Sequence, residues 1–200
     1  MTFKEKREQL KLIYRCFEES AYAYKKDAIC KIGCTYCCMH AGSIDIITLE
    51  GLIIRESINT FPKVIKTRIK KKLSSNRRDK ENRKIAPCPF LKADNTCMIY
   101  EIRPFSCRRL YSTQECRGRG PTVHRQVMKL AGETVKDMQR LDHTGYSGHI
   151  SFILYLLDKP AFRKLYLSGG YDPLKIREYG KTHGISINRV VSPPSVPLPT

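Results

Sequence analysis

CKIGCTYCCMH, residues 30–40, places four cysteines within nine positions and ends them with an adjacent pair, Cys37 and Cys38. A second group of four cysteines follows later in the chain, separated from one another by eight, nine and eight residues. The first group is Cys30, Cys34, Cys37 and Cys38, and the second group is Cys88, Cys97, Cys107 and Cys116. The ninth cysteine, Cys16, is far from both groups and is predicted to be an ordinary helix residue.

Two local structures would make the first group converge. If the segment is helical, Cys30, Cys34 and Cys37 fall within about 60° of one another on one face. If it forms a knuckle, Gly33 provides the tight turn, and Cys34 and Cys37 form a CxxC clip. Either structure leaves a metal in need of further ligands, which the second group can supply.

Metal ligation is also the physical reason for expecting order in residues 86–120. This segment holds four cysteines, three prolines and two glycines, and it lacks the periodicity of a long helix or strand. Thiolate–metal bonds can order such a segment, because they contribute roughly 10 kcal/mol or more to folding. Zinc takes four sulfur or nitrogen ligands, and an iron–sulfur cluster takes up to four cysteines. The sequence therefore predicts all eight clustered cysteines as ligands, with the choice between zinc and an iron–sulfur cluster open.

The adjacent pair argues against a single tetrahedral site. Eight thiols exceed one such site, and the side chains of neighbouring residues diverge in helices and in strands. The pair therefore indicates two metals, one cluster, or one ligand beside a structural or redox neighbour. His40 is the best candidate for a nitrogen ligand, but a surface imidazole is slightly favoured because eight cysteines already supply enough ligands. Basic residues beside the cysteines are expected to lower thiol pKa values and to offset thiolate charge, and they are Lys31, Arg103, Arg108 and Arg109.

Composition and length indicate one globular domain in a reducing compartment. The chain has 200 residues, of which 41% are apolar and 28% charged. The N-terminal segment has no apolar core of a secretory signal, and the longest apolar run, ISFILYLL at 150–157, is too short to span a bilayer. We therefore expect a cytoplasmic protein without a transmembrane segment, in which clustered cysteines favour metal ligation over disulfides.

Periodicity predicts a mainly α fold, a small helical domain with a loop-rich cysteine-bound metal lobe. Helices are expected over 3–27, from 45 or 48 to about 59, and over 62–84, 122–141, 149–158, 161–168 and 173–183. The predicted parts are an N-terminal amphipathic helix (1–29), a cysteine-cluster metal-binding domain that includes the basic helix 62–84 (30–120), a C-terminal helical extension (121–185) and a Pro-rich tail (186–200).

Half of the net charge of +18 lies in one predicted helix. Residues 63–84 contain eleven Lys or Arg against Asp79 and Glu81, a net charge of +9. Such a run predicts an anionic partner, either a nucleic acid or an acidic protein, or else simply a solvated helix face. The run carries no interleaved aromatic residues for stacking on bases.

The cysteine pattern closely resembles that of the YkgJ-type cysteine-cluster family of bacteria, described as a putative zinc- or iron-chelating domain. The matching motifs are CKIGCTYCC at 30–38, Cys-Pro-Phe-Leu at 88–91, Cys97 with Ile99-Tyr100, and Arg103-Pro104 with Cys107-Arg108. The resemblance covers about residues 30–116 and implies a small metal-chelating module. Flagellin lysine methylases, which are thought to use an iron–sulfur cluster, resemble this family in their cysteine pattern.

Three functions follow as hypotheses. The first is a metal-binding protein that chelates zinc or an iron–sulfur cluster. The second is an iron–sulfur-dependent protein-modifying enzyme similar to the lysine methylases, although no catalytic residues can be named. The third is a zinc-stabilised nucleic-acid-binding module that uses residues 63–84. Within the cysteine motifs, Phe90, Ile99, Tyr100 and Phe105 are expected to form a small core around the sulfurs.

Overall fold

A computed structural model describes residues 1–31, 33–40, 43–116, 118–170 and 173–188. The fold is mainly helical, as the periodicity predicted. The helices in chain order are α1 (Phe3–Lys25), α2 (Tyr36–His40), α3 (Thr48–Thr60), α4 (Lys63–Glu81), the 3₁₀ helix η1 (Tyr100–Ile102), α5 (Phe105–Arg108), α6 (Arg125–Leu141), α7 (Ile150–Asp158), α8 (Pro160–Leu167) and α9 (Pro173–His183).

A small antiparallel sheet at the centre was not predicted. Its strands are β1 (Asp45–Ile47), β2 (Tyr146–His149) and β3 (Ser186–Ile187), in that order across the sheet. Asp45 pairs with His149 in one ladder, and Tyr146 pairs with Ile187 in the other. The first two residues assigned to the Pro-rich tail thus form a strand, and residues 189–200 of that tail lie outside the described residues.

The apolar run at 150–157 is the centre of the main hydrophobic core. Seven of the nine residues of α7 are buried, because α3, α4, α8 and the sheet pack around it. A helix that is apolar on all sides is typical of such a buried position. Gly51 lets α3 approach α7 closely: an added Cβ would lie 2.7 Å from Leu157 Cδ1 and 2.9 Å from Ile153 Cγ2.

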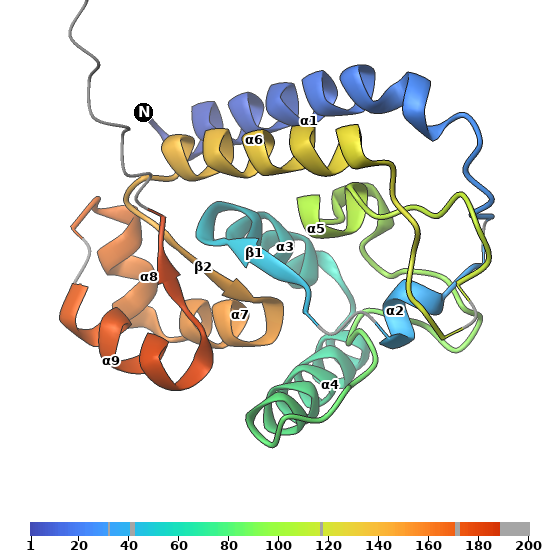
Figure 1. The fold of residues 1–200 in the computed structure, drawn as a ribbon. Coiled ribbons are helices and arrows are strands. Elements are labelled where there is room, and N and C mark those ends of the chain that lie inside the picture. Colours follow the sequence, from blue (N-terminus) through green and yellow to red (C-terminus); the bar gives the residue numbers. More distant parts are fainter. Residues whose placement is uncertain (32, 41–42, 117, 171–172, 189–200) are drawn as a thin grey trace, which may run out of the picture.

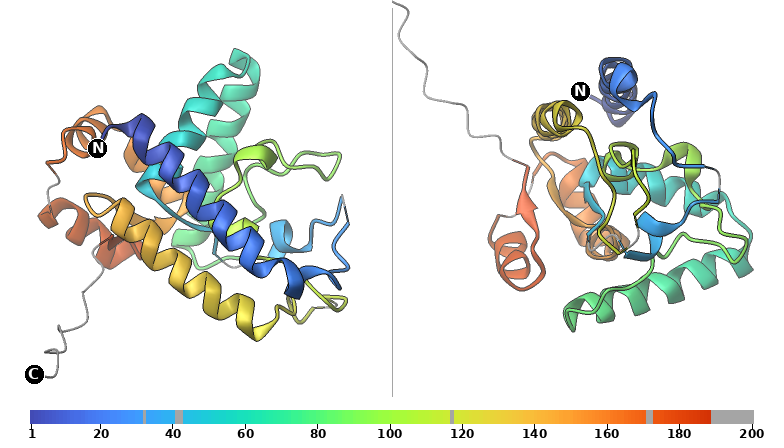
Figure 2. Two further views of the ribbon diagram at one scale, coloured as in Figure 1. Left: turned by 90° about the horizontal axis from the view of Figure 1, so that it is seen from above. Right: turned by 45° about the vertical axis from the view of Figure 1, so that its right-hand side comes forward.

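A second core cluster lies between α1 and α6, which run side by side along one face of the molecule (Figures 1 and 2). The apolar stripe of α1 buries Leu10, Phe17 and Ala21. Val127 and Ala131 of α6 belong to the same cluster. The predicted helix 3–27 is therefore confirmed with its buried face.

The eight clustered cysteines lie at one end of the molecule. Figure 1 shows α2 beside the loops that follow α4 and α5, at the end opposite α8 and α9. We call residues 30–40 and 86–116 the cysteine lobe. Apart from η1 and α5, the described residues of 86–116 form turns and loops, as predicted. Helix α4 lies on the side of the molecule away from α1 and α6 (Figure 1).

Candidate functional site

The first cysteine group combines features of the two predicted local structures. Gly33 has a φ of +88° and belongs to a turn, in which the Cys34 N–H donates to the Lys31 carbonyl at 2.9 Å. Helix α2 begins after this turn and carries both Cys37 and Cys38. Because successive helical residues are about 100° apart, the two adjacent thiols leave α2 in different directions.

Four cysteines form what we call the inner thiol set. The Cys88 N–H donates to the Cys38 carbonyl at 2.6 Å, which joins α2 to the loop after α4. An isolated β-bridge pairs Leu91 with Cys97, so this loop turns back on itself. Cys107 lies on α5 and, with Cys88 and Cys97, packs against the main core. The members of the inner thiol set are Cys38, Cys88, Cys97 and Cys107.

The other four clustered cysteines form the outer thiol set, of which Cys30 is held by Ser112. The Ile29 N–H donates to the Ser112 carbonyl at 2.9 Å, and the Ser112 N–H donates to Cys30 Sγ at 3.3 Å. The Ser112 hydroxyl also accepts from the Thr122 N–H at 2.9 Å, so this buried residue ties two loops together. The members of the outer thiol set are Cys30, Cys34, Cys37 and Cys116.

Thiol pKa values show which cysteines are neighbours. Burial, together with the nearby thiols of Cys116 and Cys30, raises the pKa of Cys37 to about 11. Burial, together with the thiols of Cys38 and Cys97, raises the pKa of Cys88 to about 12. The two sets influence each other through Cys38. Burial is the main cause of the raised pKa of both Cys37 and Cys38; the Cys38 thiol adds to the rise at Cys37, and the Cys34 thiol adds to the rise at Cys38.

All nine cysteines are free thiols. Burial raises the pKa of six of them and so favours their neutral form, namely Cys30, Cys37, Cys38, Cys88, Cys97 and Cys107. No three or more His, Cys, Asp or Glu side chains in the described ranges are arranged so that they could hold a metal ion. The thiols are thus gathered into two sets without forming a ready-made metal site. Each set nevertheless contains four thiols, a donor set that suits a thiophilic metal because a bound cation favours the thiolate form.

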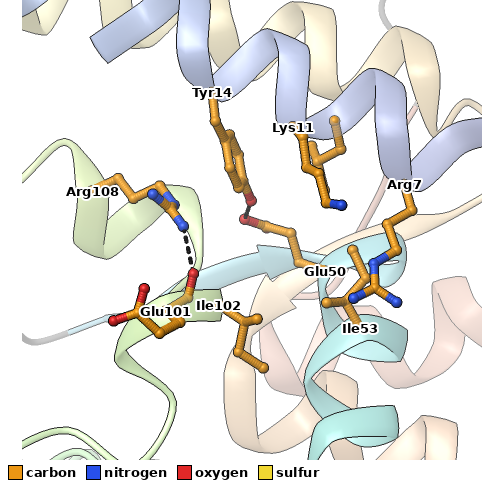
Figure 3. A pocket seen from close by; sticks show the side chains of 9 residues that line it. Arg7, Lys11, Tyr14, Glu50, Ile53, Glu101, Ile102 and Arg108 are labelled. Carbon is orange, nitrogen blue, oxygen red and sulfur yellow. Dashed lines mark hydrogen bonds between the residues drawn. The ribbon is translucent and has the colours of Figure 1, made fainter.

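A buried carboxylate, Glu50, supports the inner thiol set. Its Oε1 accepts the Phe105 N–H at 2.7 Å, which is the first amide of α5, and its Oε2 accepts the Ile47 N–H at 2.9 Å. The Tyr14 hydroxyl also donates to Oε1, at the back of a small pocket (Figure 3). Burial raises the pKa of Glu50. Burial also raises the pKa of Cys107, with smaller contributions from neighbouring thiols and from the Glu50 carboxylate. Glu50 therefore fixes the helix that carries Cys107.

A second buried carboxylate, Asp142, joins distant segments in the helical part. Its Oδ2 accepts the Leu49 N–H at 3.0 Å, near the start of α3, and the Asn188 amide at 3.2 Å. Its Oδ1 accepts the Tyr166 hydroxyl at 2.7 Å. Sequence reasoning missed both carboxylates. Ile47 is the N-cap of α3, and Glu50 stands three residues later, at the position of a capping-box acid. This spacing was the signal in the sequence that could have found Glu50.

The basic residues beside the cysteines have other partners than predicted. Arg108 forms an ion pair with Glu18 of α1 at 2.8 Å and donates to the Glu101 carbonyl at 3.0 Å (Figure 3). Arg103 lies over the Tyr100 ring. Burial raises the pKa of Cys97, and the charge of Arg103 only partly offsets that rise. Arg108 thus fastens the cysteine lobe to α1.

Of the residues predicted to lie around the sulfurs, some are buried and others are at the surface. Phe90, Ile99 and Phe105 are buried as predicted, whereas Tyr100 is 56% exposed. The ring of His40 is exposed and lies 4.6 Å from that of Tyr36. Cys16 is exposed on α1, away from the lobe, as expected of an ordinary helix residue.

Comparisons with known proteins add no name to this geometry. No family model matches the chain, and no curated protein or solved structure gives a significant match. The resemblance to the YkgJ-type family therefore stays a prediction from the cysteine motifs. Among the described helices, none has both the length and the apolar character needed to cross a bilayer.

Proposed function

We propose that this protein binds a thiophilic metal through its eight clustered cysteines, as zinc or as an iron–sulfur cluster. The observation that carries the proposal is the convergence of the inner and outer thiol sets on one end of the molecule, from segments up to 86 residues apart in sequence. Neutral thiols do not stabilise the fold by lying close together, whereas thiolate–metal bonds would stabilise such an arrangement. Nine free thiols suit the reducing cytoplasm.

The test is anaerobic purification of the reduced chain, followed by metal analysis and a visible spectrum. We expect zinc in a colourless protein, or iron with sulfide in a brown one, in stoichiometric amount. A matched control replaces the exposed Cys16 with serine and should leave the metal content unchanged. A chain that contains no metal after anaerobic purification and takes up neither zinc nor iron would contradict the proposal.

A specific feature of α4 favours a second function, binding to the phosphate backbone of a nucleic acid. Arg68, Lys71 and Arg78 are exposed and fall within about 80° on the helix surface. None of the three has an acidic partner among the residues that the structure describes. The inner side of α4 is instead used for anchoring: Lys72 donates to the Leu91 carbonyl at 2.6 Å, and Asn76 donates to the Pro87 carbonyl at 2.9 Å.

Charge reversal on that face tests this second function. The variant Arg68→Glu/Lys71→Glu/Arg78→Glu is expected to weaken duplex DNA or RNA binding and to reduce the slope of log K against log salt by about 3, roughly one per phosphate contact. Fluorescence anisotropy over a salt series measures both quantities. The matched control, Arg125→Glu/Lys129→Glu/Lys136→Glu on exposed positions of α6, makes the same change in net charge. Equal losses in both variants would show that only net charge matters.

A further inference from the structure

The apolar side of α4 is covered by the rest of the molecule. Ile69 is fully buried, and Ile65 and Leu73 pack against the main hydrophobic core. Lys72 and Asn76 bind the same side of the helix to the cysteine lobe. A helix that lies in a membrane surface buries its apolar face in lipid. Because α4 has already used that face, a membrane surface is excluded as the partner of its charged side.

The opposite side of α4 is exposed over a wide arc. At about 100° per residue, the exposed positions of 63–78 span about 160° of the helix surface, from Lys70 at one edge to Arg68 at the other. Lys63 shares the edge of Lys70, and Lys71 and Arg78 lie between the two edges. We call these five cations the basic arc. The other exposed residues of 63–78 are Val64, Thr67, Ser74 and Ser75.

The basic arc is not neutralised by the chain itself. Arg77 and Glu81 form an ion pair at 3.7 Å towards the end of α4, but Arg77 does not belong to the arc. Within the described part of the chain, none of the five cations of the arc has an acidic side chain at ion-pair distance. Like charges this close together on one helix repel each other, and a partner that carries phosphates relieves the repulsion.

The arrangement of the arc matches one kind of phosphate-bearing surface, the major groove of a duplex. An α-helix with its side chains is about 10–12 Å across, and the major groove of B-form DNA is about 12 Å wide. A helix in that groove has a phosphate backbone on each side and base edges in front of it. Cations stand at both edges and in the middle of the basic arc, and α4 lies at the outer edge of the molecule (Figure 1).

Resting on the second proposed function, phosphate binding by α4, we propose that this helix lies in the major groove of B-form DNA and contacts the phosphates of both strands. Double-stranded RNA does not fit, since the major groove of an A-form helix is deep and narrow. Lysine and arginine commonly donate to O6 and N7 of guanine, so Lys71 and Arg78 favour guanine in front of the helix. The ligand class is therefore duplex DNA with guanines in the contacted turn.

A DNA duplex and an RNA duplex of the same length and guanine-containing sequence are the probes, used with the full chain. Fluorescence anisotropy at one salt concentration should show that the DNA duplex binds at least about 10-fold more tightly. Dimethyl sulfate methylates N7 of guanine, an atom of the major groove. The bound chain should protect guanines in the contacted turn from this reagent.

Variants at the two edges of the arc test whether both strands are contacted. Lys63→Gln/Lys70→Gln should reduce the slope of log K against log salt by about 2, and Arg68→Gln at the other edge should reduce it by about 1. The control Lys129→Gln/Lys136→Gln, at exposed positions of α6, makes the same change in net charge as the first variant and should leave the slope unchanged.

The outcomes separate this inference from the function on which it rests. Equal affinity for the two duplexes, guanine N7 atoms that stay reactive, or a slope that falls for one edge alone would overturn the groove inference and leave phosphate binding by α4 intact. Failure of the wild-type chain to bind either duplex would overturn the second proposed function itself.

Discussion

If the clustered cysteines bind a metal as proposed, removing it from the reduced protein is expected to loosen the cysteine lobe and to lower the stability of the whole chain. A ligand that binds only the folded state at 1,000 times its dissociation constant stabilises that state by about 4 kcal/mol. Loss of the metal should therefore shift the denaturation midpoint by a corresponding amount. Hydrogen exchange should rise in residues 86–116, because the loops between Phe90, Ile99 and Phe105 are no longer held by thiolate bonds.

The effect should be local as well as global. Phe90, Ile99 and Phe105 remain buried in the two core clusters, so the metal-free lobe keeps three apolar anchors while its turns open. Exchange in helices α6 and α7, whose contacts lie in the helical part, should rise only through the lower global stability and therefore less than in residues 86–116. Chelator and zinc-saturated samples are compared by denaturant titration and by exchange mass spectrometry. Identical midpoints and identical exchange in a chain known to carry metal would contradict the prediction.

Asp142→Ala is expected to lower the free energy of unfolding by about 3–5 kcal/mol. The substitution leaves three buried donors without their acceptor: the Leu49 N–H, the Tyr166 hydroxyl and the Asn188 amide. It also removes the carboxylate that lies 3.9 Å from Lys6 of α1. Urea denaturation measures the loss. The control Asp137→Ala, at an exposed carboxylate paired with Arg140, should cost less than about 1 kcal/mol.

The same residue predicts a dependence on pH. Burial raises the pKa of Asp142 from 3.8 to about 6, so the folded state prefers the protonated acid. Its stabilising contribution is complete below pH 3.8 and is lost as the pH rises through 6, an effect of about 3 kcal/mol. His149 acts in the opposite sense: burial lowers its pKa from 6.5 to about 4, so its contribution is complete above pH 6.5 and is lost as the pH falls through 4. The two effects oppose each other in the wild type.

Asp142→Asn separates these contributions. The amide keeps an acceptor for the Leu49 N–H but cannot ionise, so stability should now rise more steeply between pH 4 and 6.5 than in the wild type. Asp137→Asn, at an exposed carboxylate, should leave the wild-type profile unchanged. Parallel profiles for the wild type and Asp142→Asn would show that Asp142 does not titrate in this range.

The helices could be predicted because local signals marked both of their ends. Helix α4 begins after Pro62 and ends before Pro87, and α7 is bounded by His149 and Pro160. The sheet could not be predicted, since strands of two to four residues such as Ser186–Ile187 show no alternation of apolar and polar positions. Strand β1 pairs with β2 across about 100 residues and β2 pairs with β3 across about 40, and no local pattern carries such contacts.

The eight cysteines stay predicted ligands, and the sequence did not predict how they are arranged. Spacing and residue type were enough to select eight cysteines and to set Cys16 aside. The separation of Cys37 from Cys38 depends on where α2 begins, and Tyr36 gives no capping signal for that boundary. Asp142 follows the last turn of α6 and resembled an ordinary polar residue at a helix end, because the groups that bury it come from α3, α8 and Asn188.

The pairing of α1 with α6 also bears on how the protein is made. Ribosomes add about 5–20 residues per second, so the roughly 100 residues between Lys25 and Arg125 take about 5–20 s to synthesise. Throughout that interval the stripe formed by Leu10, Phe17 and Ala21 lacks α6, the helix that packs along it, and only residues such as Leu49 and Phe105 can cover part of it. The nascent chain therefore presents an amphipathic helix to chaperones well before its own core can form.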